Sequence, residues 1–406
     1  MKNFTVIGID DGRMPEFDAK TKDLIDRSKC FSGGARHYEI VKNYLPADSE
    51  WIMIKVPLNS VFEKYELHSD IVVFASGDPL FFGFATTIKE RVPEASLTVI
   101  PHFNSLQTLA HKSVTPYHDM IPVSLVGRDW HEFDKRVIEG CCKIGVLTDK
   151  EHSPDKIASR MLSYGYHNYR AIIGVNLGNH YKEQIIKCSL KEMSEISFEN
   201  PNCLILEKTS CRCREFGIAD SKFELLDNRD KMITKAGIRL LSLSMLDLRN
   251  RVRFWDIGFC TGSVSIEAKL QFPHLKITAF EVREEGTALM ETNTRRFGTP
   301  GIEYHIGDFN NFDITRLESP DAIFIGGHGG ELKKMVERCA QSLSDGGVIV
   351  FNSVSKASKN EFIESCKSFG IEIVCQTKIK IDDNNAIGVI KGIKQQKSRP
   401  SYGKSR

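Results

Sequence analysis

The chain has 406 residues, of which 41% are hydrophobic and 27% charged, and its formal net charge is +2. This length suits two domains of about 200 residues each, and the composition is typical of globular proteins. The near-neutral charge excludes a strong attraction to nucleic acid or membrane surfaces, and no apolar run is long enough to span a bilayer. We expect the first residues to form a strand rather than a signal peptide, and the 11 cysteines show no zinc-site spacing. We therefore expect a cytoplasmic protein with reduced thiols and no metal site.

Strand-like apolar runs alternate with amphipathic helical stretches in both halves, which predicts α/β architecture throughout. We expect one domain over 1–208, a second over 212–393 and a basic, disordered tail over 394–406. Thr234 is a candidate N-cap for the first helix of the second domain. The predicted strands are 4–9, 51–56, 71–75, 97–100, 144–147, 171–175, 201–207, 253–257, 276–280, 302–306, 322–325 and 348–351, and the clearest helices are 235–248 and 331–342.

In the first half, the strand 71–75 runs into Ser76, Gly77, Asp78 and Pro79. We expect a helix to begin near residue 81, with Asp78 as its cap. Pro79 would lie at its start, where the missing N–H loses no hydrogen bond. The segment is either part of a ligand site or only a structural turn.

In the second half, the strand 253–257 contains Asp256 and leads through Gly258 and Gly262 to a helix expected to begin at Ser263. The two glycines let the backbone turn sharply and approach a ligand, and a helix N-terminus can receive polar or anionic groups. A NAD site would contain Gly-x-Gly-x-x-Gly and a P-loop Gly-Lys-Ser/Thr, and neither pattern is present here.

The next two strand ends also carry polar residues. Glu281 follows the second strand and could accept hydrogen bonds from a ribose diol. Asp308 follows the third strand and could accept from an adenine amino group, while Phe309 could pack on the ring. Together with the glycine turn, these strand ends predict a nucleoside pocket at the carboxyl edge of a parallel sheet. The alternative is a glycine turn in a fold without a ligand.

His328 is surrounded by four glycines at the end of the strand 322–325. The backbone N–H groups of Gly326, Gly327 and Gly329 could face a substrate carboxylate, and His328 could bind or move a proton, which makes it the candidate catalytic residue. The alternative is a flexible turn with a solvated histidine.

These motifs resemble those of known methyltransferases. The order of the two halves resembles the fused, bifunctional methyltransferases of corrin-ring synthesis. These join a tetrapyrrole-methylase α/β domain to a Rossmann-like class I domain dependent on S-adenosylmethionine (SAM). The segments 33–37, 76–83 and 125–128 are similar to the C5-methylating branch of the tetrapyrrole methylases. The segments 256–263, 293–298, 307–308 and 326–330, with Glu281, are similar to decarboxylating C15-methylases.

The resemblance implies that carbons 5 and 15 of precorrin-6B, or of its cobalt form, receive methyl groups from SAM. It also implies that the ring C acetate loses carbon dioxide. We expect a tetrapyrrole substrate, no nucleic-acid or membrane partner, and a homo-oligomer. Arginine pairs well with the substrate's carboxylates. The implied SAM contacts are Gly8, Ser76, Gly77 and Asp78 in the first domain and Thr234, Gly258, Gly262, Glu281 and Asp308 in the second, and the candidate substrate contacts are Arg36, Arg128, Arg295 and Arg296.

The first domain departs from its relatives at two loops. Asp10 and Asp11 stand in a loop that usually reads Gly-x-Gly-Pro-Gly, and His102 and Phe103 stand where Gly-Val is usual. Both changes add bulk or charge beside the expected site and bear on activity more than on fold. Two other functions stay open. One is a SAM methyltransferase acting on another small molecule or on RNA, and the other is a nucleotide-binding regulatory or scaffold protein.

Overall fold

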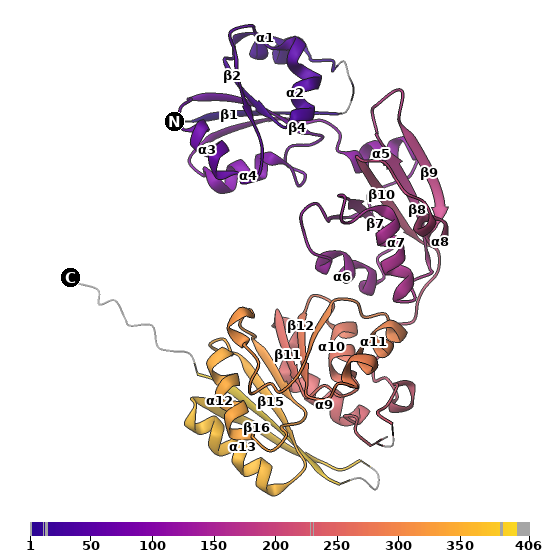
Figure 1. The fold of residues 1–406 in the computed structure, drawn as a ribbon, viewed down its shortest axis with the longest axis vertical. Coiled ribbons are helices and arrows are strands. Elements are labelled where there is room, and N and C mark those ends of the chain that lie inside the picture. Colours follow the sequence, from indigo (N-terminus) through magenta and orange to yellow (C-terminus); the bar gives the residue numbers. More distant parts are fainter. Residues whose placement is uncertain are drawn as a thin grey trace, which may run out of the picture. The chain divides into compact units, whose positions relative to one another are not determined.

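The structure is a computed structural model that describes residues 2–10, 12, 15–227, 229, 231–381 and 385–395. Its elements divide into two compact units, each described separately below (Figure 1). Among the described residues, no helix combines the length and apolar character needed to cross a membrane. Unit 1 comprises Met1–Arg128, Cys141–Leu162 and His167–Ser210, and unit 2 comprises Asp129–Gly140, Ser163–Tyr166 and Cys211–Arg406.

The first sheet of unit 1 has five parallel strands in the order β3-β2-β4-β1-β5. Because successive side chains of a strand point to opposite faces, Phe4 and Val6 pack toward α3 and α4, whereas Ile7 and Ile9 pack toward α1 and α2. The elements are β1 (Asn3–Ile9), α1 (Ala19–Arg27), β2 (Cys30–Gly33), α2 (Ala35–Val41), β3 (Glu50–Met53), α3 (Asn59–Tyr65), β4 (Asp70–Ser76), α4 (Phe84–Arg91) and β5 (Ser96–Ile100).

The second sheet of unit 1 is mixed and has the order β6-β7-β10-β8-β9. Only β6 and β7 pair in parallel, and α5 covers one face by packing Leu106 and Leu109 against Ile172 and Ile205. The elements are α5 (Ser105–Ser113), β6 (Ile121–Ser124), β7 (Lys143–Leu147), α7 (Pro154–Ser163), β8 (Tyr169–Val175), β9 (Gln184–Ser189), α8 (Leu190–Glu195) and β10 (Asn202–Lys208).

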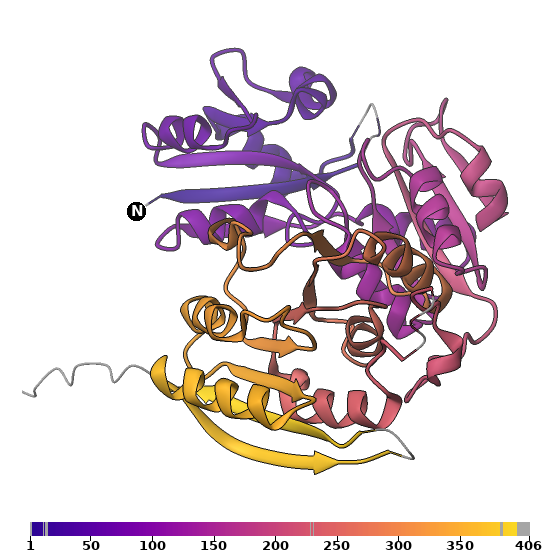
Figure 2. The same ribbon diagram turned by 60° about the horizontal axis from the view of Figure 1, so that its bottom comes forward.

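Unit 2 contains a seven-stranded sheet in the order β13-β12-β11-β14-β15-β17-β16. Its first five strands are parallel, and the antiparallel pair β16–β17 closes one edge, drawn in yellow in Figure 2. The elements are α6 (His131–Glu139), α9 (Ala236–Leu246), β11 (Arg253–Ile257), α10 (Ser263–Gln271), β12 (Lys276–Glu281), α11 (Gly286–Phe297), β13 (Ile302–Ile306), β14 (Ala322–Ile325), α12 (Leu332–Ser342), β15 (Val348–Ser353), α13 (Lys356–Ser368), β16 (Ile371–Ile379) and β17 (Ile387–Lys394).

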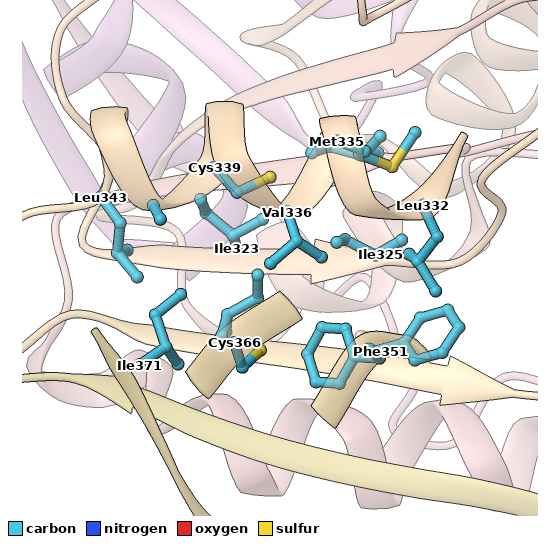
Figure 3. Close-up of a cluster of buried hydrophobic side chains, with 14 of the residues drawn as sticks. Ile323, Ile325, Leu332, Met335, Val336, Cys339, Leu343, Phe351, Cys366 and Ile371 are labelled. Atoms are coloured by element: carbon cyan, nitrogen blue, oxygen red, sulfur yellow. The ribbon is translucent and has the colours of Figure 1, made fainter. Parts of the chain in front are cut away.

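Helices cover both faces of this sheet. On one face, Leu332 and Val336 of α12 pack against Ile323 and Ile325 of β14 (Figure 3). Phe362 of α13 belongs to the same cluster. On the other face, side chains of α9 and α10 pack on the same strands. Burial on both faces explains why these parallel strands are continuous apolar runs. It also leaves the strand ends as the places where polar groups can meet a ligand.

The α/β class expected for both halves is confirmed, but the helix cap predicted in each half is wrong. The cap position of α9 is Lys235 rather than Thr234, and the Ala236 N–H donates instead to Asp220 Oδ1 at 3.0 Å. Asp78 does not cap α4, which begins at Phe84; its Oδ1 accepts the Leu80 N–H at 2.9 Å and closes a turn.

The expected tail starts too early, because β17 continues through Lys394. Residues 396–406, the rest of that tail, lie outside the described residues.

The segment 129–140 carries α6 and groups with unit 2, where Ile138 joins a buried cluster with Ile218 and Leu270.

Candidate active sites

A cavity of about 790 Å³ lies at the carboxyl ends of the parallel strands of unit 2. It opens where the strand order reverses between β11 and β14, the usual position of ligand sites in open α/β sheets. Four strand ends line it, through Gly258, Glu281, Asp308 and His328. The structure therefore brings together the polar strand ends that the sequence analysis singled out.

Two glycine turns meet at this cavity. Gly258 has φ +80°, and a Cβ there would lie 2.7 Å from the backbone N of Gly327. A side chain at position 258 would therefore push the two loops apart. Gly326, Gly327 and Gly329 also line the cavity, and Gly329 has φ +58°. The resulting bare backbone surface suits a ligand that approaches closely.

Three of the expected cofactor contacts lie behind the cavity wall. A Cβ on Gly262 would lie 2.8 Å from Met290 Sδ, so glycine there serves helix packing. Ser263 is buried as the first residue of α10. Asp256 is fully buried, and its Oδ2 accepts from Ser265 N–H at 3.1 Å and from Ser265 Oγ at 2.6 Å. None of the three lines the cavity, so their contact with a ligand stays a prediction that this cavity does not support.

The Asp256 carboxyl is nevertheless unusual. Burial raises its pKa to about 7, and the nearby Glu281 carboxylate raises it further, against the hydrogen bonds from Ser265. Its Oδ1 atom has no hydrogen-bond partner among the described residues. This carboxyl anchors the start of α10 from inside the core.

Glu281 is held in place by the loop that it faces. The side chain is 2% exposed, and its Oε2 accepts the Cys260 N–H at 2.9 Å. Its Oε1 accepts from the Arg283 backbone N–H at 3.0 Å and from Arg283 Nη1 at 2.8 Å. Two carboxylate oxygens offer about four acceptor positions, so three are used and one remains for a ligand hydroxyl.

The loop after β13 contributes Asp308, Phe309 and Asn310. Asp308 is exposed, and its Oδ1 accepts the Asn310 N–H at 2.9 Å. Phe309 is 4% exposed and packs edge-on against Trp255 and Phe280, so it belongs mostly to the core and offers a ligand only the part that lines the cavity. Asn310 lines the same cavity and was not predicted, because an isolated asparagine carries no sequence signal.

His328 is half-buried at the end of β14. Its Nδ1 accepts the Gly330 N–H at 3.2 Å, so the neutral ring carries its proton on Nε2. Its ring centroid lies 6.0 Å from that of Phe351. The histidine is therefore oriented by its own turn at the cavity rather than extended into solvent.

The two arginines expected to bind substrate in this half lie elsewhere. Arg295 pairs with Glu291 at 3.5 Å, and Arg296 donates to the Lys222 carbonyl at 2.7 Å and to Glu224 Oε2 at 2.9 Å. Neither lines the cavity, and the partners of both lie outside it. The cationic side chains that line it are Lys231, Lys235 and Arg283, and Thr234 belongs to the same wall.

Unit 1 has a cavity of about 430 Å³ at the carboxyl ends of β1 and β4. Ser76 and Gly77 line it, whereas Gly8 and Asp78 do not. A Cβ on Gly8 would lie 2.1 Å from the Gly77 carbonyl oxygen, so this glycine allows two strand ends to touch. Gly77 has φ +60°, and a Cβ there would lie 2.9 Å from Asn104 Cα.

Both arginines expected in unit 1 are near this cavity. Arg36 lines it and donates from Nη2 to Ser76 Oγ at 2.8 Å. The Arg128 guanidinium lies 5.0 Å from the ring centroid of Phe82, which lines the cavity, but Arg128 itself does not. His37 was not predicted as a site residue, yet it lines the cavity and contacts Ser76.

No group of three or more His, Cys, Asp or Glu side chains that could hold a metal ion is found in the part of the chain that the structure describes.

Comparisons with known proteins match a different family to each half of the chain. The family of tetrapyrrole (corrin/porphyrin) methylases matches residues 4–194, and the precorrin methyltransferase domain matches residues 226–402. The chain is thus an enzyme with two different methyltransferase domains.

Relatives include the precorrin-6Y C(5,15)-methyltransferase [decarboxylating] of Sinorhizobium sp, 28% identical over 86% of this chain and 84% of the relative. A probable cobalt-precorrin-6B C(15)-methyltransferase (decarboxylating) of Thermoplasma volcanium is 33% identical over 40% of this chain and 80% of the relative. The chain belongs to the family of decarboxylating precorrin-6Y C(5,15)-methyltransferases. A crystal structure of a precorrin-6Y C5,15-methyltransferase from Geobacter metallireducens is 27% identical over 44% of this chain and 98% of that chain, with a TM-score of 0.41.

Proposed function

We propose that this chain transfers methyl groups from SAM to carbons 5 and 15 of precorrin-6B, or of its cobalt form, in cobalamin biosynthesis. Unit 1 would methylate carbon 5, and unit 2 would methylate carbon 15 and release carbon dioxide from the ring C acetate. The observation that carries this proposal is the unit 2 cavity, where the glycine loops meet beside a buried carboxylate.

The residues around that cavity fit SAM. The free acceptor position of Glu281 would take a ribose hydroxyl, and Asp308 would accept from the adenine amino group. The loop at Gly258, which has no Cβ, lets the ligand approach the backbone. SAM supplies an activated methyl group, so the chain's own contribution is to position an electron-rich ring carbon in line with it and to exclude water.

The substrate carries several carboxylates, and the cavity offers groups that bind them. Lys231, Lys235 and Arg283 are the cations at the wall, and the 326–329 turn offers backbone N–H groups. In the decarboxylation, the bond between the acetate methylene and its carboxylate breaks, and its electron pair passes into the conjugated ring. Electrons of the ring then form a C–H bond at the methylene carbon, and we assign delivery of that proton to His328. The ring would take up a proton from solvent and give it through Nε2, which returns the ring to the neutral form that accepts the Gly330 N–H on Nδ1.

We also propose that the reaction takes place in the cytoplasm, where the 11 free cysteines would remain reduced. The experiment that tests the whole proposal is mass spectrometry of the product formed by the full chain from SAM and precorrin-6B. We expect the gain of two methyl groups and the loss of one carbon dioxide. A product with one methyl group would remove the assignment of catalysis to unit 1, and a product that keeps all its carboxylates would remove decarboxylation.

A further inference from the structure

The hydroxyl of Ser76 in the unit 1 cavity receives hydrogen bonds from two side chains of α2. Arg36 Nη2 lies 2.8 Å from Ser76 Oγ, and His37 Nε2 lies at the same distance of 2.8 Å. A guanidinium can only donate, so the Arg36 contact uses one lone pair of the serine oxygen. What the serine proton does therefore depends on which nitrogen of His37 carries hydrogen.

The backbone decides that question. The Gly34 N–H donates to His37 Nδ1 at 3.2 Å, so Nδ1 must be unprotonated. Burial lowers the pKa of His37 to about 4, and the adjacent Arg36 guanidinium acts in the same direction. A neutral imidazole with an accepting Nδ1 carries its hydrogen on Nε2, and so His37 donates to Ser76 Oγ.

A hydroxyl has two lone pairs and one hydrogen. Among the described residues, Arg36 and His37 are the hydrogen-bond partners recorded for Ser76 Oγ, and both donate to it. The hydroxyl hydrogen must therefore be directed toward a third group. Ser76, Arg36 and His37 all line the cavity, so that hydrogen is available to an acceptor bound there.

We propose that Ser76 and Arg36 bind a carboxylate in unit 1, and that His37 is a positioning residue that keeps the Ser76 hydroxyl a donor. This inference rests on the proposed function of unit 1 as a SAM-binding methyltransferase. It names the side chains that hold one end of the SAM molecule. A serine O–H and a guanidinium N–H are both strong donors to a carboxylate, and neither can be turned into an acceptor here.

The charges around the cavity favour the α-amino-acid end of SAM as the source of this carboxylate. The charged side chains among its described lining residues are Arg36 and Asp10. Asp10 follows Ile9, which pairs with Ser76 across β1 and β4, so Asp10 comes directly after the residue paired with the serine that Arg36 contacts. A zwitterion with one carboxylate and one ammonium matches both charges, whereas a tetrapyrrole carboxylate would meet the like charge of Asp10.

The test compares two ligands in the full chain by hydrogen exchange and mass spectrometry. S-adenosylhomocysteine has the α-amino-acid group, and 5′-methylthioadenosine lacks it. Peptides from β4 and the turn at 76–83 report binding in unit 1 separately from unit 2. We expect Ser76→Ala and Arg36→Gln each to weaken the S-adenosylhomocysteine-dependent protection about 10-fold or more. Protection by 5′-methylthioadenosine should stay unchanged.

Substitutions at His37 separate positioning from folding. Gln places an amide donor near the position of Nε2, so His37→Gln should retain most of the binding, whereas His37→Phe should lose as much as Ser76→Ala. Arg27→Gln is the matched surface control, because Arg27 pairs only with Asp23 on α1 among its recorded contacts. If His37→Phe unfolds the unit, His37→Gln and Ser76→Ala still decide the question.

Three results would overturn the inference while leaving a donor site in unit 1. In the first, the wild-type chain binds the two ligands with equal affinity. In the second, the variants weaken the binding of both ligands equally. In the third, the variants bind S-adenosylhomocysteine as the wild type does but have a raised KM for the tetrapyrrole. The last result would assign the pair to a substrate carboxylate. No protection of unit 1 by either ligand would overturn the donor site and this inference together.

Discussion

Replacement of Glu281 tests the proposed SAM site of unit 2. The carboxylate has about four acceptor positions, and three are used by Cys260 and Arg283. One remaining position takes one ribose hydroxyl, and rotation of the half-exposed Arg283 side chain would free a second. A hydrogen bond to a charged group contributes about 1.5–3 kcal/mol, so Glu281→Ala should weaken donor binding about 10- to 150-fold.

The assay is calorimetric titration of the full chain with S-adenosylhomocysteine. The proposed unit 1 site serves as the internal reference, because Glu281 belongs to unit 2. Glu281→Gln keeps an acceptor for the Cys260 N–H but lacks the charge, so its loss of affinity should be smaller than that of Glu281→Ala. Glu284→Gln, at an exposed position of the same loop, is the control and should change nothing. If neither Glu281 variant changes any dissociation constant, the carboxylate does not hold the ribose.

Three further predictions concern two buried groups of unit 2 and its proposed proton donor. Arg239→Ala leaves Glu267 buried without its 3.2 Å partner and should lower the free energy of unfolding in urea by about 3–5 kcal/mol. The control Arg253→Ala breaks a half-exposed pair and should cost at most about 1 kcal/mol, so equal losses would contradict the argument. Burial raises the pKa of Asp256 from 3.8 to about 7, so the folded state binds this proton more tightly than the unfolded state. Its contribution to stability is present below pH 3.8 and disappears as the pH rises through 7. Asp256→Asn should therefore flatten the fall in stability between these values, and an unchanged profile would show that the carboxyl is ionised in the fold. His328→Asn should yield a product that is methylated but retains its acetate, measured by mass spectrometry, whereas normal loss of carbon dioxide would exclude His328 as the proton donor.

The positions of the strand ends could be predicted from local sequence alone. An apolar run that stops at Gly258, Glu281 or Asp308 shows where a buried parallel strand leaves the core. Parallel strands necessarily align their carboxyl ends at one edge of the sheet. The structure confirms that these ends share one cavity. The order of the two methyltransferase domains was likewise predictable from motifs in the chain.

The sequence could not determine which side chains face the cavities. Asp256, Gly262 and Ser263 belong to the same motif as Gly258, yet they lie behind the wall because α10 packs directly on β11 and α11. Arg296 was a candidate by its chemistry, but the turn of α11 that carries it directs it to Glu224. Such directions depend on helix starts and packing, which local patterns do not specify.

The tertiary structure alone decided the contacts between distant residues. His37 and Ser76 are 39 positions apart, and only the parallel packing of β2 and β4 brings α2 over the end of β4. Lys231, Lys235 and Arg283 reach the unit 2 cavity from segments on either side of the glycine loop. The sequence determined which strands are buried and which polar groups follow them, because an apolar run and a glycine turn are both local patterns in the chain. The tertiary structure determined the partners, because a hydrogen bond requires two groups to meet in space.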